Sequence, residues 1–222
     1  NITYFFISFL LIVSCKTKSS LKENKDKPDF TIAFGSCNKQ NSENVLWEKI
    51  VTHNPNVWIW GGDNIYSDTE DMDKMAMDYK TQNEQKGYNL LMQNDIKILG
   101  IWDDHDYGAN DAGKEYSKRE ESQQLFLDFF DVPKESSRRN REGIYHSKVF
   151  KAENGTVKVI LLDTRYFRDS LIRRNKVYLK NQTGTILGEK QWNWFSNELN
   201  NSKADFNIVV SSIQVLAEEH RF

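Results

Sequence analysis

Residue types that bind metal ions follow three apolar segments of this sequence. In chain order they are Cys37, then Asp63, Asn64 and Tyr66, then Asp103, Asp104, His105 and Asp106. Carboxylate, amide, phenol, thiol and imidazole groups together suit a trivalent or mixed-metal site better than a tetrahedral zinc cage. Several acids in one cleft repel each other, and bound cations remove that repulsion. The pattern therefore predicts a metal centre.

The segments before these residues predict the strands that position them. Residues 30–34, 57–60 and 96–102 are apolar or β-branched runs that end at polar residues. Helices are expected between them, one after an N-cap at Asn41 or Ser42 and one over residues 72–92. Neighbouring parallel strands lie about 5 Å apart. The sequence thus predicts an α/β fold with its site at the carboxyl ends of the strands.

The second half of the chain predicts further elements. They are a helix over 122–130, an antiparallel hairpin of 144–150 and 157–162 around Asn154 and Gly155, a helix over 188–199 with a Trp192, Phe195 and Leu199 stripe, and a buried strand over 206–210. Trp192 and Trp194 are expected to pack at the core and surface rather than to bind a cofactor. No internal repeat is present.

Each metal-binding group also has an ordinary interpretation when taken alone. Asp63 and Asn64 after two glycines are typical of a turn, and Cys37 of a small buried side chain. Residues 103–106 are also typical of a solvated loop or a helix N-cap, and Tyr66 of simple packing. Their shared position after apolar strands favours the metal site.

Other polar residues are candidates for the same edge. Arg165 follows the strand 157–162, where it could bind a phosphate oxygen. The alternative is an ion pair of Asp163 with Arg165 or Arg168. Ser212 and Gln214 end the last strand, where they either line the site or cap a turn. The arginine run 138–141 is typical of a solvated loop, with steering of an anionic substrate as the alternative. His53 is expected at the surface, and His146 and His220 receive no role.

Four motifs resemble the PhoD-like alkaline phosphatases of the calcineurin-type metallophosphoesterase superfamily over residues 30–222. They are Phe34-Gly35-Ser36-Cys37, Trp60-Gly61-Gly62-Asp63-Asn64-Ile65-Tyr66, Trp102-Asp103-Asp104-His105-Asp106-Tyr107-Gly108 and Leu162-Asp163-Thr164-Arg165. The resemblance implies a four-layer α/β/β/α sandwich, here incomplete at the C-terminus, with ferric iron (Fe3+) and calcium (Ca2+) as cofactors. It implies that Asp63 bridges two metals, that Cys37 and Tyr66 help to hold the ferric ion, and that Asn64 lies beside the substrate. Asp104 takes a metal-ligand place, and His105 faces the phosphate.

Two departures from the wider superfamily stand out. The usual Asp-x-His opening is replaced by Gly35-Ser36-Cys37, so the first metal is expected to differ from the usual one. The late Gly-Asp and His-rich motifs would lie beyond Phe222. We therefore expect the chain to be a fragment that lacks at least one metal ligand.

The first 28 residues differ from the rest. Residues 4–13 are an apolar run, too short to span a bilayer, and Cys15 follows it in a segment that resembles a bacterial lipobox. This predicts a signal peptide over 1–14, a lipidated Cys15, a polar tether over 15–28 and the catalytic domain over 29–222. A buried strand or helix is the alternative for the apolar run. The expected location is the membrane of a bacterium, on its periplasmic or outer side.

The charge balance of the chain argues against nucleic-acid binding. The 30 basic and 32 acidic residues give a net charge of −2, so no basic field attracts nucleic acid.

The predicted function is hydrolysis of a phosphate monoester or diester, phospholipid included, by attack of a metal-bound hydroxide. His105 would donate to the leaving oxygen. The alternative is a surface lipoprotein that binds calcium through the acidic segment 63–73 without catalysis.

Overall fold

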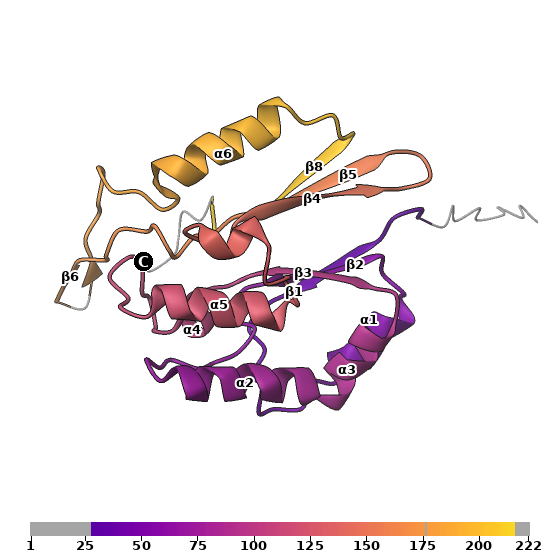
Figure 1. Cartoon of the computed structure of the whole chain (residues 1–222), viewed down its shortest axis with the longest axis horizontal. Coiled ribbons are helices and arrows are strands. Elements are labelled where there is room, and N and C mark those ends of the chain that lie inside the picture. The colour runs from indigo at the N-terminus through magenta and orange to yellow at the C-terminus, as the bar shows by residue number, and fades with distance from the viewer. Residues whose placement is uncertain (1–27, 176, 216–222) are drawn as a thin grey trace, which may run out of the picture.

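The structure is a computed structural model that describes residues 28–175 and 177–215. Two three-stranded sheets lie face to face between helices, with α6 outside one sheet and α1, α2, α3 and α5 outside the other (Figure 1). The predicted α/β class is confirmed. The proposed signal peptide, Cys15 and nearly all of the tether lie outside the described residues, as does His220.

The first sheet is parallel, in the order β1-β2-β3. Its strands are β1 (Ile32–Gly35), β2 (Val57–Gly61) and β3 (Lys97–Ile101). They coincide with three predicted strands and lie side by side, because each crossover contains helical segments that return the chain to the same edge. All three strands therefore deliver their following residues to one edge.

Helices cover the outer face of this sheet. They are α1 (Leu46–Thr52), α2 (Met72–Glu84), α3 (Lys86–Gln93) and α5 (Arg119–Phe129). Trp47 of α1 is buried against Trp58 and Trp60 of β2 and against Tyr88 of α3, with ring centroids 5.2 to 5.3 Å from Trp47. These aromatic contacts hold the helices on the sheet.

The helix predicted over 72–92 is wrong in one respect, because it breaks at Gln85. There the backbone is extended, with ψ at 123°, and the side-chain amide donates to the carbonyl oxygens of Lys39, Gln40 and Ser42. The break turns α3 so that Gly87 lies against Trp47. The predicted cap of α1 is also wrong, since Val45 occupies the N-cap and Asn44 accepts from Leu46 N.

The second sheet has the order β4-β5-β8. Its strands are β4 (His146–Lys151), β5 (Thr156–Leu161) and β8 (Phe206–Val210), and β8 runs parallel to β5. The hairpin of β4 and β5 is confirmed. The prediction that residues 206–210 are buried is wrong in the described structure: β8 is an edge strand, and Phe206 is 66% exposed.

Helix α6 (Gly188–Asn200) packs on the second sheet through only one residue of the predicted stripe, Phe195. Trp194 and Phe195 pack against buried Ile160 and Leu162, whereas Trp192 is 50% exposed. A short hairpin, β6 (Arg173–Arg174) with β7 (Val177–Tyr178), precedes α6, and the sequence pattern had not indicated it. Its residues lack an alternating apolar pattern long enough to mark strands.

The arginine run 138–141 is not a solvated loop, and steering of an anionic substrate by it stays a prediction. A 3-10 helix, η1 (Ser137–Asn140), contains most of it. The guanidinium of Arg139 donates to the carbonyl oxygens of Val132 and Pro133 and pairs with Asp128, and that of Arg141 lies over the ring of Tyr145. These arginines therefore fix the chain between α5 and β4.

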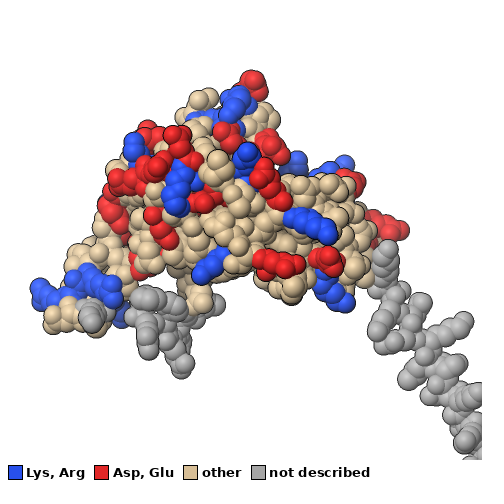
Figure 2. Space-filling model, turned by 90° about the horizontal axis from the view of Figure 1, so that it is seen from below, with Lys and Arg blue, Asp and Glu red and all other residues tan. Residues whose placement is uncertain are grey.

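Surface charge is mixed. Acidic and basic side chains alternate over the face in Figure 2, and basic ones gather at the left end, where β6 and β7 lie. This face carries no broad basic surface of the kind that binds nucleic acid. Among the described helices, none has the length and apolar character to cross a membrane.

Candidate metal centre

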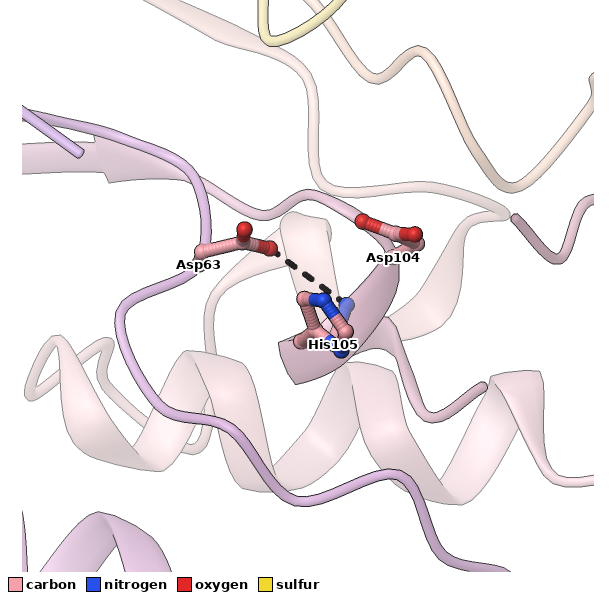
Figure 3. Close-up of side chains that lie close together, drawn as sticks. All are labelled: Asp63, Asp104 and His105. Atoms are coloured by element: carbon pink, nitrogen blue, oxygen red, sulfur yellow. Dashed lines mark hydrogen bonds between the residues drawn. The ribbon is translucent and has the colours of Figure 1, made fainter. Parts of the chain in front are cut away.

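Asp63, Asp104 and His105 form a cluster at the carboxyl edge of the first sheet (Figure 3). Asp63 follows β2, and the other two lie on α4 (Asp104–Tyr107), directly after β3. Each offers one ligand atom, and these atoms lie within 4.8 Å of one another. The sequence analysis predicted that these side chains meet, because neighbouring parallel strands end at the same edge of the sheet.

The acidic segment after β3 is both a helix start and part of the cluster. Asp103 caps α4, and Asp106 completes a capping box while its buried carboxylate accepts from Asn64 N at 3.0 Å. The helix N-cap considered for this segment is confirmed, whereas the solvated loop is wrong because Asp104 and Asp106 are buried. The metal role of the segment stays a prediction. Capping by Asp103 and Asp106 directs Asp104 and His105 toward Asp63.

Cys37 and Tyr66 lie against the same carboxylate. Cys37 Sγ is 3.5 Å from Asp63 Oδ2, and the side chain of Cys37 is exposed. Burial, followed by hydrogen bonds with Cys37 and Asp63, raises the pKa of Tyr66 above its usual value. The ring of Tyr66 also lies 4.3 Å from that of His105, measured between centroids. The predicted metal ligands Cys37, Tyr66 and Asp104 therefore all lie near the fourth, Asp63, or near His105.

The charge of the cluster is unbalanced. Burial, and then the charge of Asp104, raises the pKa of Asp63. The pKa of Asp104 is lowered despite its burial, because Arg165 lies nearby and Asp111 N donates to it. Asp63 has no comparable cationic partner among the described residues. A bound cation would supply one, so this donor set fits a metal ion.

Several residues around the cluster adopt left-handed backbone conformations. They are Cys37, Asp63, Asp68 and Asp111, with φ between 44° and 61°. Such conformations cost about 1 kcal/mol or more each and often occur at functional sites. Gly62 has φ at 108°, and a Cβ there would lie 2.7 Å from Asp103 Cβ. Only glycine allows β2 to present Asp63 this close to the end of β3.

Asn64 and Arg165, both predicted to meet substrate, are held by the protein. The buried amide of Asn64 donates to Ile101 O and Asp106 Oδ2, although its Oδ1 has no partner among the described residues. The guanidinium of Arg165 lies 2.6 to 2.7 Å from Asp103 Oδ1. The considered ion pair with Asp163 is wrong, because Arg165 pairs with Asp103. Substrate contact by either residue stays a prediction.

Two polar residues that the sequence analysis missed position the cluster. Gln40 is buried, and its amide donates to Tyr66 O at 3.2 Å and accepts from Tyr66 N at 2.9 Å. Asp68 Oδ2 lies 2.6 Å from His105 Nδ1. Because a carboxylate accepts, Nδ1 carries a proton and Nε2 is the ring atom left for the site. The position of Asp68 in the loop after β2 was the only available signal.

The hydrolytic turnover that the sequence analysis predicts should fall about 10- to 100-fold when Asp68 is replaced with Asn, while the bound metal content changes little. The amide keeps the size of the side chain but removes the charged acceptor that orients His105. Turnover and metal content measured on the same preparation test this. Unchanged turnover, together with an unchanged pH–rate profile, would show that the contact with Asp68 does not position His105. Asp71→Asn, in the same loop, is the matched control.

A cavity of about 590 Å³ adjoins the cluster. Asp104 lines it, together with Ser212 and Gln214, which the sequence analysis had placed at this edge. Ser212 Oγ is also 2.6 Å from Thr164 Oγ1. The cavity gives the candidate metal centre space for an organic ligand.

Comparisons with known proteins identify a family and a similar fold. The sequence matches the PhoD-like phosphatase family over residues 88–220, more than half of the chain. A solved structure titled "Structure of PhoD" superposes with a TM-score of 0.61 at 19% sequence identity, covering 81% of this chain and 41% of that chain. This chain therefore spans less than half the length of the solved one. The comparison with curated proteins gives no match.

Proposed function

The chain belongs to the PhoD-like phosphatase family, and from this premise we propose that the protein is a metal-dependent hydrolase of phosphate monoesters or diesters. The observation that carries the proposal is the cluster of Asp63, Asp104 and His105, whose ligand atoms lie within 4.8 Å of one another beside a cavity. The partial superposition on PhoD supports an α/β fold of that kind. We further propose that the whole protein forms the four-layer α/β/β/α sandwich of the metallophosphoesterases.

The donor set supports an iron and calcium centre. The raised pKa of Tyr66 keeps its phenol protonated in the metal-free protein, so a metal ion would have to displace that proton. A thiolate and a phenolate formed in this way beside a carboxylate favour a ferric ion, so Cys37, Tyr66 and Asp63 are the proposed iron ligands. Asp63 would also contact calcium together with Asp104, since calcium prefers carboxylate oxygen. A calcium-binding lipoprotein without catalysis would have no use for Cys37 at 3.5 Å from Asp63.

The chain's own residues define how a phosphoester would be held. Bound metal ions would lower the pKa of water and neutralise charge on the phosphoryl group. Asp68 orients the ring of His105, whose Nε2 faces the site and, when protonated, can donate to the leaving oxygen. Arg165 ties Asp103 and Asp104 together, with Nη2 3.6 Å from Asp104 Oδ1, so it keeps the second carboxylate in place.

One experiment tests the proposed function directly. Metal content of the purified full-length protein is measured alongside turnover of nitrophenyl phosphate and bis-nitrophenyl phosphate. We expect iron and calcium, with turnover that is lost on chelation and restored by the same metals. Turnover that persists in Asp104→Ala, or that needs no metal, would contradict the proposal. The ratio of the two rates distinguishes a monoesterase from a diesterase.

The ferric assignment has a spectroscopic test. The metal-loaded protein should absorb visible light through charge transfer from Cys37 and Tyr66 to iron. Cys37→Ser should weaken or shift that band and lower turnover, because serine is a weaker electron donor than a thiolate. An active but colourless protein that contains only zinc or calcium would exclude iron. The band of an Asp95→Asn control should match that of the wild type.

Anchoring to a bacterial membrane is a separate proposal that rests on the sequence alone. The apolar run over residues 4–13 and the small residue before Cys15 support removal of residues 1–14 and acylation of Cys15. We expect mass spectrometry of the membrane fraction to find an acylated N-terminal Cys15. An unmodified Cys15 still joined to Ser14 would contradict it.

A further inference from the structure

The cavity beside the cluster is lined by charged and by apolar residues. The charged ones are Asp103, Asp104, Asp111, Asp169, Arg165 and Arg168, and the apolar ones, here called the apolar side, include Leu171, Ile172, Leu179 and Ile186. Asp104 belongs to the proposed metal centre, so any molecule bound there would lie between that centre and the apolar side. This arrangement suits a ligand with one anionic end and one apolar end.

Arg168 is a buried charge that forms no ion pair with a carboxylate in the described part of the chain. The residue is 6% exposed, and its Nη2 donates to the carbonyl oxygen of Asp111. Among residues 28–175 and 177–215, no carboxylate forms an ion pair with it, and the buried Nε has no hydrogen-bond partner. Arg165, by contrast, is paired with Asp103. Leaving a guanidinium buried and unpaired is costly, so an anion is expected beside Arg168.

Electrostatics at Arg168 agree with this expectation. Burial, and then the neighbouring Arg165, lowers the pKa of Arg168. The carboxylates of Glu115, Asp111 and Asp103 act in the opposite direction on this pKa. Each of them has another partner: Glu115 accepts from Gly113 N and Ser170 Oγ, Asp111 from the hydroxyl of Tyr178, and Asp103 pairs with Arg165. None of the three forms an ion pair with Arg168, so an incoming anion could bind there.

A single residue, Asp111, connects Arg168 to the proposed metal ligand Asp104. Asp111 N donates to Asp104 Oδ2 at 2.7 Å, while Asp111 O accepts from Arg168. The same peptide segment thus links the carboxylate that would hold the metal to the unpaired guanidinium. A phosphoryl group at the metal centre would therefore lie near the carboxylate of Asp104 and the guanidinium of Arg168.

The apolar side is exposed to solvent in the described structure. Ile172 is 61% exposed, and Leu171, Leu179 and Ile186 are 39% to 44% exposed. Leu179 N donates to Ile172 O at 2.8 Å, which extends the pairing of β6 and β7 and holds Ile172 opposite Leu179. Figure 1 shows this hairpin beside the loops that precede α6. Contact with an apolar group would remove this surface from water.

We propose that Arg168 binds a phosphoryl oxygen of the substrate and that Leu171, Ile172, Leu179 and Ile186 contact its organic part. The substrate class is then a phosphoester of a bulky, apolar alcohol. This inference rests on the proposed hydrolase function and deepens it by assigning the cavity to the leaving group. It also places at Arg168 the phosphate contact that the sequence had suggested for Arg165.

Binding of two non-hydrolysable probes tests the assignment. Phenylphosphonate and methylphosphonate are titrated by calorimetry into the whole chain, with metal content matched between variants. Phenylphosphonate should bind about tenfold more tightly, because its ring contacts the apolar side. Arg168→Gln should weaken both probes about tenfold or more, since a charge-assisted hydrogen bond is lost. Ile186→Ser should reduce the preference for the ring and leave methylphosphonate unchanged.

Controls separate this inference from the proposed function. Lys190→Gln removes an exposed cation paired with Glu142 and should change neither affinity. If Arg168→Gln does not fold, Arg168→Lys and Ile186→Ser carry the test. Equal affinity for the two probes, or full affinity in a folded Arg168 variant, would overturn the inference while metal-dependent hydrolysis stands. Loss of hydrolysis in every preparation, with probe binding that still depends on Arg168, would overturn the hydrolase instead.

Discussion

Replacing Asp63 with Asn should weaken metal binding by at least about 100-fold and abolish phosphoester turnover, while the fold remains. The side chain is buried between Cys37 and the start of α4, and it is the proposed ligand of both metals. Loss of a residue that merely orients a ligand costs about 10- to 100-fold in metal affinity or activity. Loss of a direct, shared ligand should cost more.

The metal-free protein should not lose stability through this change. Burial and Asp104 raise the folded-state pKa of Asp63 above its unfolded value, so ionisation at neutral pH destabilises the folded chain. Stability from this group is present at low pH and is lost as the pH rises through the folded pKa. The uncharged amide of the Asp63→Asn variant removes that loss. We therefore expect the metal-free Tm at pH 7 to stay unchanged or to rise.

The pH dependence of metal binding gives a second measurement on the wild type. A metal ion must displace the proton that Asp63 holds, so affinity should fall as the pH falls through the raised pKa. Calorimetric titration across that range tests it, and Asp95→Asn, at an exposed carboxylate before β3, is the matched control. Near wild-type affinity and turnover in Asp63→Asn would place the metal centre elsewhere.

The geometry of the cluster was predictable because parallel strands obey a simple rule. The strands before Cys37, Asp63 and Asp104 have apolar patterns that the sequence displays, and adjacent parallel strands end at one edge. No knowledge of side-chain packing is needed for that step. The position of the proposed ligands therefore follows from local pattern and topology.

Residues that act through loops were not predictable in this way. Asp68 reaches His105 because the loop after β2 turns back at a left-handed residue, and no periodicity encodes that turn. Arg165 and Arg168 lie close together in sequence, and their different partners depend on the path of residues 108–113. The exposure of β8 has another origin, since apolar composition alone cannot distinguish an edge strand from a central one.

The partners of Asp163 could not be predicted from the sequence either, and replacing this residue has the largest expected effect on stability. The sequence analysis considered it as an ion-pair partner of Arg165 or Arg168. In the structure its fully buried carboxylate accepts from four N–H groups instead, each at 2.9 Å. The donors are Trp102 Nε1 and the backbone nitrogens of Ile144, Arg165 and Tyr166. The backbone of Asp163 is bonded in addition to the side chain of Gln191 in α6.

These contacts make Asp163 a junction between the two sheets. Trp102 follows β3 of the first sheet, whereas Asp163 follows β5 of the second. Ile144 precedes β4, so one carboxylate fixes three chain segments around the core. Buried donors that lose an acceptor cost about 1–3 kcal/mol each, and hydrogen bonds to charged groups are the stronger ones.

Asp163→Asn should therefore destabilise the protein by about 3–5 kcal/mol, because an amide has one acceptor oxygen where the carboxylate has two. If the amide oxygen keeps the three donors at Oδ1, its NH2 group faces the N–H of Ile144. Urea unfolding at pH 7 measures the loss, and the Tm should fall by roughly 10 °C. Asp205→Asn is the matched control, since its carboxylate is exposed and accepts from Thr156 N at 2.7 Å, and its change should alter the free energy of unfolding little. A loss at Asp163 no larger than that at Asp205 would show that the four contacts do not hold the two sheets together.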